Sequence, residues 1–250
     1  MTDKGTQFGM LHWGPCVVHT KLQKPILDKL YVAAIGSQKS ANEELAGVLK
    51  EQLHIKDKDQ FGEFFNSMFT LYNHALKQWR KDIKQDSKYF LEKLWCNFQK
   101  KDEFNPPHSH GGALSFVIYL KVPEELKQEN EKYDGLSAGP GGITFLYGQA
   151  EDYTISNHSF FPEEGDMFIF PAYLKHWVYP YKKVMNNLNV IKRSEMKKDD
   201  IVLLYGTTKL PVDDCKVRFK DKHGKEYEVE ISRLIKVFNN NIWENKKSVK

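Results

Sequence analysis

Two stretches of the sequence repeat apolar residues every three or four positions, which is the spacing of one face of an α-helix. Residues 24–36 carry such a face and end at a glycine, as many helices do. Residues 61–83 carry a longer, aromatic stripe, which we interpret as the side of a helix that packs on a sheet. The segment that starts at Ser40 resembles a helix cap and predicts a further short helix that ends at Leu53.

Short apolar runs between Gly- and Pro-containing turns predict β-strands in much of the remaining sequence. A charged segment at 124–131 predicts a short helix between two of them. Many short strands with few intervening helices favour an all-β barrel or a jelly roll. The predicted strands cover residues 8–20, the end of 89–100, and residues 114–122, 143–147, 152–155 and 166–170.

The strand at the end of residues 89–100 alternates between two different faces. One face is apolar, and the other combines two amides with an indole ring. The second face fits either the solvent side of a sheet or the lining of a pocket for a polar ligand, and the sequence leaves both open. The apolar face holds Leu94, Cys96 and Phe98, and the polar face holds Trp95, Asn97 and Gln99.

Three histidines stand at the ends of predicted strands. His108 and His110 are two residues apart, so strand geometry would turn both side chains to the same side. His176 follows the strand 166–170 and a bend that contains a proline. Three imidazoles that converge inside a barrel form a site for a divalent metal. We interpret the other histidines as structural: His12, His19, His54, His74, His158 and His223.

The spacing around His176 also indicates a metal site of the cupin type. Five residues separate Gly165 from Pro171, and four more separate Pro171 from His176, which matches the second cupin motif. The pair of histidines upstream strengthens this interpretation, because a cupin-like barrel places its metal at the narrow mouth.

Composition and charge narrow the setting in which the protein works. A hydrophobic content of 40% is enough for a core, and the three cysteines have no paired spacing, which is typical of a reducing compartment. We find no membrane span and no secretory signal, and expect a cytoplasmic protein. The net charge is roughly −3 over residues 1–180 and roughly +7 over 181–250. We interpret the basic part as solvated surface and do not expect nucleic acid binding.

Several longer strings resemble the 2-oxoglutarate/Fe(II)-dependent oxygenases encoded by marine cyanophages and related tailed phages. The resemblance covers about two thirds of the chain, from Trp13 to Pro180. It implies a mostly β fold with flanking helices (α+β), in which N-terminal helices buttress a double-stranded β-helix core (a cupin-like jelly roll). The strings are Leu94-Trp-Cys-Asn-Phe-Gln-Lys, Glu103-Phe-Asn-Pro-Pro-His-Ser-His, Leu114-Ser-Phe-Val-Ile-Tyr-Leu, Pro140-Gly-Gly-Ile-Thr-Phe, and Gly165-Asp-Met-Phe-Ile-Phe-Pro with His176.

The resemblance also implies a reaction. Non-haem Fe(II), 2-oxoglutarate and O2 would hydroxylate an unidentified substrate, with release of succinate and CO2, in the cytoplasm of an infected host cell. His108, His110 and His176 are the implied iron ligands and catalytic centre. Asn97 and Tyr119 are candidates for binding the cosubstrate.

Two positions depart from the pattern of this superfamily. Most members carry Asp or Glu where this chain has His110, so His110 is either the third iron ligand or a neighbour that leaves a position on the iron open. Most members also pair the far carboxylate of 2-oxoglutarate with an Arg or Lys past the distal histidine. Arg193, which precedes Ser194, is the nearest match, and Lys182 and Lys183 come earlier in the chain.

The C-terminal part of the chain has its own pattern. Basic residues alternate with apolar ones over 215–220, and acidic residues do so over 226–231, which predicts a hairpin. We therefore expect an oxygenase domain at 1–195 and a C-terminal hairpin-and-helix extension at 196–250.

Two other functions fit the same residues. One is a cupin-type metal protein that uses three histidines without 2-oxoglutarate. The other is a non-catalytic phage or host-binding protein on a degenerate barrel. Metal content separates the second from the first, and coupled succinate production separates the first from an oxygenase.

Overall fold

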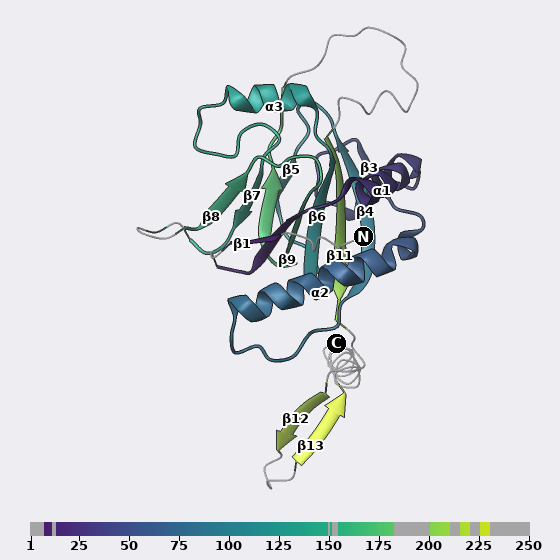
Figure 1. Cartoon of the computed structure of the whole chain (residues 1–250), viewed down its shortest axis with the longest axis vertical. Helices are drawn as coiled ribbons and strands as arrows, with labels where there is room; N and C mark the ends of the chain where they lie inside the picture. The colour runs from purple at the N-terminus through teal and green to yellow at the C-terminus, as the bar shows by residue number, and fades with distance from the viewer. Residues whose placement is uncertain are drawn as a thin grey trace, which may run out of the picture.

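Two antiparallel β-sheets face each other in this protein, and helices cover the outer face of the larger one (Figure 1). The computed structural model describes residues 8–11, 14–149, 151, 155–182, 201–210, 216–220 and 226–230. The larger sheet has seven strands, in the order β1 (Phe8–Leu11), β2 (Val17–Lys21), β9 (Asp166–Pro171), β6 (Leu114–Lys121), β11 (Ile201–Lys209), β4 (Phe90–Gln99) and β3 (Glu51–His54). The smaller sheet has four strands, in the order β5 (Asn105–His108), β10 (Lys175–Val178), β7 (Ile143–Leu146) and β8 (Asn157–Phe160).

The chain crosses repeatedly between the two sheets. From β4 to β11 it places β4, β6, β9 and β11 in the larger sheet and β5, β7, β8 and β10 in the smaller one. This order is that of a double-stranded β-helix, and the predicted mostly β, jelly-roll fold is confirmed.

Both faces of the larger sheet are buried, each against a different layer. In β4, Leu94, Cys96 and Phe98 pack toward the helices, whereas Trp95 packs in the space between the sheets. The predicted alternation is therefore confirmed. The solvent-side interpretation of the second face is wrong, because Asn97 is only 2% exposed.

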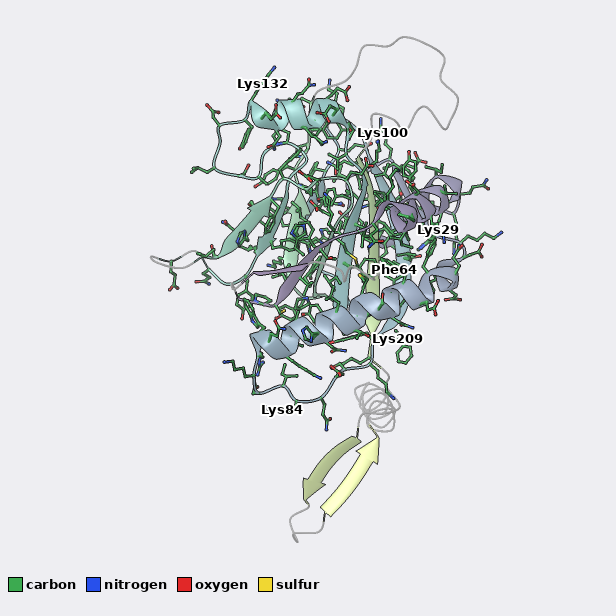
Figure 2. The ribbon with its side chains drawn as sticks, viewed as in Figure 1. Lys29, Phe64, Lys84, Lys100, Lys132 and Lys209 are labelled. Carbon is green, nitrogen blue, oxygen red and sulfur yellow. The ribbon has the colours of Figure 1, made fainter. Side chains whose placement is uncertain are left out.

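The predicted aromatic stripe lies on helix α2 (Gly62–Trp79), which packs with α1 (Lys24–Gly36) against the larger sheet. The ring of Phe65 stacks on Phe116 of β6, with the centroids 4.7 Å apart. Helix α3 (Glu124–Glu131) also forms where its sequence predicts it. Figure 2 shows Lys29 of α1 and Lys132, at the end of α3, pointing away from the core. No helix in the described part of the chain has the length and apolar character of a membrane span.

The helix predicted from Ser40 to Leu53 is wrong. Only a 3-10 turn, η1 (Asn42–Glu44), forms there, and it is followed by β3. The Asn42 side chain explains the difference, because its amide donates to the carbonyl of Lys50 and its oxygen accepts the N–H of Gln52. Such bonds to the backbone compete with a helix. A second 3-10 turn, η2 (Lys58–Phe61), precedes α2.

Two of the predicted strands differ from the structure. Residues 8–20 form the two paired strands β1 and β2, with Gly14 between them at a φ of 51°, which favours glycine. The strand predicted at 152–155 lies largely outside the described residues, and the described strand β8 begins at Asn157.

Strand β11 lies in the middle of the larger sheet, hydrogen-bonded to β4 on one side and to β6 on the other. Its side chains alternate between the helix layer (Val202 and Leu204) and the interior (Leu203 and Tyr205). A domain boundary at residue 195, as expected from the sequence, would therefore separate β11 from the barrel in which it pairs.

The predicted C-terminal hairpin is present as β12 (Lys216–Lys220) paired with β13 (Glu226–Glu230). The register sets Lys216 opposite Glu230 and Arg218 opposite Glu228, so basic and acidic positions face each other as the sequence indicated. The final helix predicted after this hairpin lies outside the described residues.

Candidate metal centre and its pocket

The three histidines of the two sequence motifs come together between the sheets. His108 ends β5 and is the direct cross-strand partner of His176 in β10, with the ring centroids 4.4 Å apart. The ring of His110 lies 4.8 Å from that of His108 and 5.1 Å from that of His176. The convergence predicted from the spacing is therefore present.

His110 reaches this position by a route that the sequence did not predict. It lies two residues beyond the end of β5, in a loop, and its N–H donates to the carbonyl of Ala172 at 2.8 Å. The N–H of Ala172 in turn donates to Ala113 at 3.0 Å. The loop is thus bonded to the turn between β9 and β10, and this turn also delivers His176.

The Gly-Pro-His spacing corresponds to one strand with a turn at each end. Gly165 has a φ of 93° in the turn before β9, and its N–H donates to Tyr119 at 2.7 Å. Pro171 ends β9, and its carbonyl accepts the N–H of Leu174 at 2.9 Å. This tight turn reverses the chain into β10, where His176 is fully buried.

The hydrogen bonds of the rings leave ligand atoms free. His108 Nδ1 lies 2.7 Å from the carbonyl of Pro106, and His176 Nδ1 lies 2.9 Å from the carbonyl of Leu174. A carbonyl can only accept, so both Nδ1 atoms carry the proton of the neutral ring and leave Nε2 with a lone pair. Within the described residues, the buried Nε2 atoms of His110 and His176 have no hydrogen-bond partner.

This donor set fits a first-row divalent metal such as Fe(II). One ligand nitrogen from each ring lies within 4.8 Å of the others. Imidazole suits Fe(II), and a backbone carbonyl bonded to the second ring nitrogen is the usual way to fix a ligating histidine. His108, His110 and His176 would therefore hold the metal.

Burial keeps these rings neutral. It lowers the pKa of His108, lowers the pKa of His110 to about 3, and lowers the pKa of His176 well below its usual value. The nearby His108 lowers the pKa of His110 further, and His108 and His110 together do the same for His176. Metal binding requires neutral imidazole, so the rings do not have to lose a proton near neutral pH to bind a metal.

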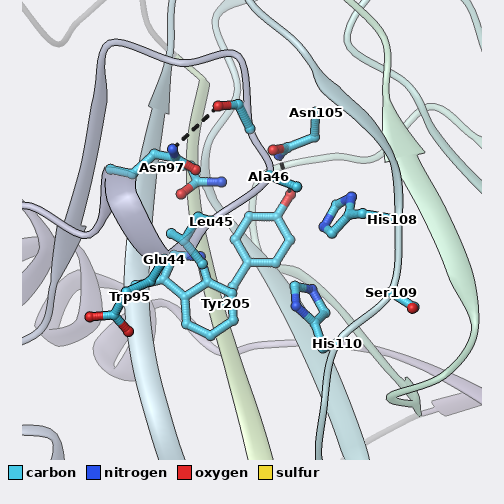
Figure 3. Close-up of a pocket in the computed structure, with 12 residues that line it drawn as sticks. Glu44, Leu45, Ala46, Trp95, Asn97, Asn105, His108, Ser109, His110 and Tyr205 are labelled. Carbon is cyan, nitrogen blue, oxygen red and sulfur yellow. Dashed lines mark hydrogen bonds between the residues drawn. The ribbon is translucent and has the colours of Figure 1, made fainter.

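A pocket of about 130 Å³ opens beside His108 and His110 (Figure 3). Its polar lining includes Asn97, Asn105 and Tyr205, and Figure 3 shows Tyr205 beside the two histidines. Among the described residues, no lysine or arginine lines it. Its one acidic residue, Glu44, is paired with Lys93 at 2.8 Å and with His54 at 3.1 Å.

The other candidates from the sequence have different positions. Asn97 lines the pocket, whereas Tyr119 lies deeper between the sheets, fully buried, with a hydroxyl that has no partner among the described residues. Burial and the nearby Tyr205 raise the pKa of Tyr119 well above its usual value. Lys182 is exposed and bonds through its N–H to Glu129, and Arg193 lies outside the described residues.

Sequence reasoning missed Asn105 and Tyr205 as pocket residues. The only sequence signal for Asn105 was its position just before two prolines and the histidines. Tyr205 belongs to β11, which the sequence assigned to the extension. Its place opposite Trp95 depends on pairing between distant segments.

A comparison with protein families identifies the central segment. Residues 93–187 match the family model described as "Putative 2OG-Fe(II) oxygenase", and this segment contains all three histidines. The match covers less than half of the chain, and it shows that the segment with the metal centre is similar to 2-oxoglutarate- and Fe(II)-dependent oxygenases. The matched family uses Fe(II) and 2-oxoglutarate, which are the expected cofactors. The comparison with curated protein sequences gives no match.

Several solved structures are similar to this chain at low sequence identity. The viral collagen prolyl hydroxylase of Paramecium bursaria Chlorella virus 1, in its 2OG complex, is 15% identical, with a TM-score of 0.44 over 77% of this chain and 94% of that one. A prolyl-4-hydroxylase from Pseudomonas putida is 11% identical, with a TM-score of 0.43 over 76% and 90%. An oxidoreductase of the 2OG-Fe(II) oxygenase family from Burkholderia pseudomallei is 11% identical, with a TM-score of 0.46 over 77% and 84%. The functional assignment rests on the family match and the histidines.

Proposed function

We propose that the protein is a 2-oxoglutarate- and Fe(II)-dependent oxygenase. It hydroxylates a C–H bond of its substrate at an iron held by His108, His110 and His176, with release of succinate and CO2. The observation that carries this proposal is the cluster of three imidazoles beside a polar pocket. Two of them, His110 and His176, have a buried Nε2 without a hydrogen-bond partner among the described residues. When bound, Fe(II), 2-oxoglutarate and O2 supply oxidative chemistry that amino-acid side chains lack.

The residues of the chain position and shield that chemistry. Phe170 lies against the buried ring of His176, with the centroids 4.8 Å apart, and Phe145 lies on the same ring at 6.2 Å. These apolar walls keep bulk water from the inner side of the site. The half-buried rings of His108 and His110 stand on the side that faces the pocket.

We propose that His110 is the third iron ligand and not only a neighbour of the metal. Its Nε2 is buried without a partner in the described part of the chain, and its ring stands at a similar distance from both other rings. An unpartnered buried nitrogen is costly, and a metal bond would satisfy it. Asn97, Tyr119 and Arg193 remain the candidates for contacts to 2-oxoglutarate.

The test is anaerobic reconstitution with Fe(II), followed by titration with 2-oxoglutarate. We expect one iron per chain and a saturable absorption band in the visible region that requires both iron and the oxo acid. Succinate should then form when O2 is admitted with a substrate. Stoichiometric iron without any response to 2-oxoglutarate would instead identify a three-histidine metal protein of the cupin type.

We also propose a tailed-phage origin and a place of action in the host cytoplasm, which the long strings resembling cyanophage oxygenases support. Sequencing the genomic neighbourhood of the gene tests this. Adjacent capsid or tail genes are the expected result, and a neighbourhood of cellular genes only would contradict it.

A further inference from the structure

The pocket beside the metal centre carries neutral hydrogen-bonding groups at its buried end. Asn105 Nδ2 donates to the Tyr205 hydroxyl oxygen at 3.3 Å, which leaves the Tyr205 proton available to an acceptor in the pocket. Tyr205 is 1% exposed, and its ring stacks on Trp95 at 5.7 Å and 10°, so the position of the hydroxyl is fixed by packing.

Asn97 adds a second group that points to a missing ligand. It is 2% exposed, and its Oδ1 has no partner among the described residues. Gln52, which is 1% exposed and lines the same pocket, also has an unpartnered side-chain oxygen. Buried polar atoms are normally hydrogen-bonded, and a half-turn of the Asn97 amide presents an N–H donor instead of the oxygen.

The charges in the site explain why neutral groups suffice to hold 2-oxoglutarate. Fe(II) carries two positive charges, three neutral imidazoles add none, and 2-oxoglutarate carries two negative charges. The loaded site is therefore neutral overall without any lysine or arginine. A carboxylate ligand in place of His110 would leave one negative charge, which a nearby cation would have to balance.

We propose that the far carboxylate of 2-oxoglutarate is held in this pocket by neutral donors, chiefly the Tyr205 hydroxyl and the Asn97 amide, in place of a basic side chain. This inference rests on the proposed function. A buried carboxylate without partners is costly, but one that accepts two or three hydrogen bonds is stabilised in its charged form. The pocket volume of about 130 Å³ accommodates the short tail of an oxo acid bound to the metal through its other end.

The experiment compares two acids that differ only at the far end. 2-Oxopentanoate has the chain of 2-oxoglutarate with a methyl group in place of the far carboxylate. Binding of each acid to the Fe(II)-loaded protein is measured anaerobically by calorimetry, together with iron content. The parent should bind 2-oxoglutarate more tightly than 2-oxopentanoate.

Tyr205→Phe keeps the ring and its stacking on Trp95 but removes the donor. We expect it to weaken 2-oxoglutarate by about ten- to a hundredfold, since hydrogen bonds to charged groups contribute about 1.5–3 kcal/mol. Binding of 2-oxopentanoate and of iron should not change. Asn97→Asp, which places a like charge in the pocket, should also weaken only 2-oxoglutarate.

Three results would overturn the inference. One is a Tyr205→Phe protein that discriminates between the two acids as the parent does. Another is an equal loss of affinity for both acids, which would indicate a general structural effect. The third is an Arg193→Ala protein that no longer discriminates between the two acids while Tyr205→Phe still does. This result would assign the far carboxylate to Arg193. A parent that binds iron but neither acid would contradict the proposed function itself, and this outcome is distinguishable from the other three.

Discussion

His176 and His108 face each other directly across the β10–β5 pair, and the register of the two strands shifts just beyond them, between His176 and Val178. On its other edge β10 pairs with β7, where His176 stands opposite Phe145. Two of the three candidate ligands are therefore set by strand register. A slip of one residue in β10 would turn His176 to the opposite face of the sheet.

His176→Ala should abolish stoichiometric iron binding, because a site of two histidines is left. His158→Ala is the matched control. His158 lies on β8 of the same sheet, stacked on Phe160 and outside the cluster of three. Iron per chain, measured after anaerobic loading and desalting, checks both variants. Retention of one iron in His176→Ala would show that the metal centre lies elsewhere.

His110→Asp should keep its iron but bind 2-oxoglutarate more weakly. A carboxylate is an ordinary ligand for non-haem Fe(II), so the metal stays. The loaded site would then carry one uncompensated negative charge beside a pocket whose described lining has no lysine or arginine. We expect a loss of about tenfold in affinity, equivalent to about 1.4 kcal/mol. Calorimetry on the iron-loaded variant measures it, and tighter binding of 2-oxoglutarate would contradict the charge argument.

The sequence was sufficient to predict those elements whose buried face follows from a regular spacing of apolar residues. The apolar stripe of α2 and the alternation in β4 each follow from a period along the chain. The failed helix at Ser40–Leu53 shows a limit of this reasoning. Its capping pattern is present, but the Asn42 side chain bonds to the backbone of later residues and favours β3.

The candidate site was only partly predictable for a related reason. His108, His110 and Asn97 belong to short motifs and could be found by reading along the chain. Tyr205 could not be found in this way, because its role depends on β11 pairing with β4, and a run of apolar residues does not reveal its partner strand. The alternating charges near the C-terminus also favoured a separate extension, to which the sequence analysis assigned the residues of β11.

Gly206→Ala tests the central place of β11 in the larger sheet. A Cβ at Gly206 would lie 2.2 Å from the Phe116 ring and 2.9 Å from the backbone oxygen of Lys93. Overpacking of this kind typically costs about 1–3 kcal/mol. We expect the free energy of unfolding to fall by about that amount in urea denaturation. Gly36→Ala, where no atom lies within 4 Å of the added Cβ, is the control and should change little. Equal stability of the two variants would argue against the β11–β6 pairing.

Asp166→Asn should destabilise the protein near neutral pH and much less in acid. Burial raises the pKa of Asp166, but three groups outweigh it: the His19 ring, whose Nε2 lies 3.1 Å from Oδ1, the N–H of Glu163, which donates to the carboxylate, and the charge of Lys21. The pKa therefore lies below the usual 3.8. A lowered pKa means that the carboxylate adds stability above its unfolded pKa. This stability is lost as the pH falls through the folded pKa.

The measurement is urea unfolding of the parent and the Asp166→Asn variant between pH 7 and pH 3. We expect a difference of about 1.5–3 kcal/mol at pH 7, the usual contribution of hydrogen bonds to a charged group, and a smaller difference at pH 3. Asp28→Asn removes an exposed ion pair with Lys24 and is the control. Its effect should be small at both pH values, because solvent screens an exposed ion pair. A difference for Asp166→Asn that does not shrink toward pH 3 would rule out the carboxylate as its source.

Tyr119→Phe should raise stability and lower 2-oxoglutarate affinity, two effects of opposite sign. The Tyr119 hydroxyl is fully buried and has no partner among the described residues, so its removal relieves an unsatisfied group that costs about 1–3 kcal/mol. Unfolding of the metal-free variant should therefore require more urea than that of the parent. Tyr205→Phe provides the contrast, since its hydroxyl accepts a bond from Asn105 and its removal should not stabilise the protein. If both effects are observed, the Tyr119 hydroxyl destabilises the free protein and contributes to the binding of 2-oxoglutarate. If Tyr119→Phe gained stability and bound 2-oxoglutarate as the parent does, Tyr119 would have no part in holding the cosubstrate.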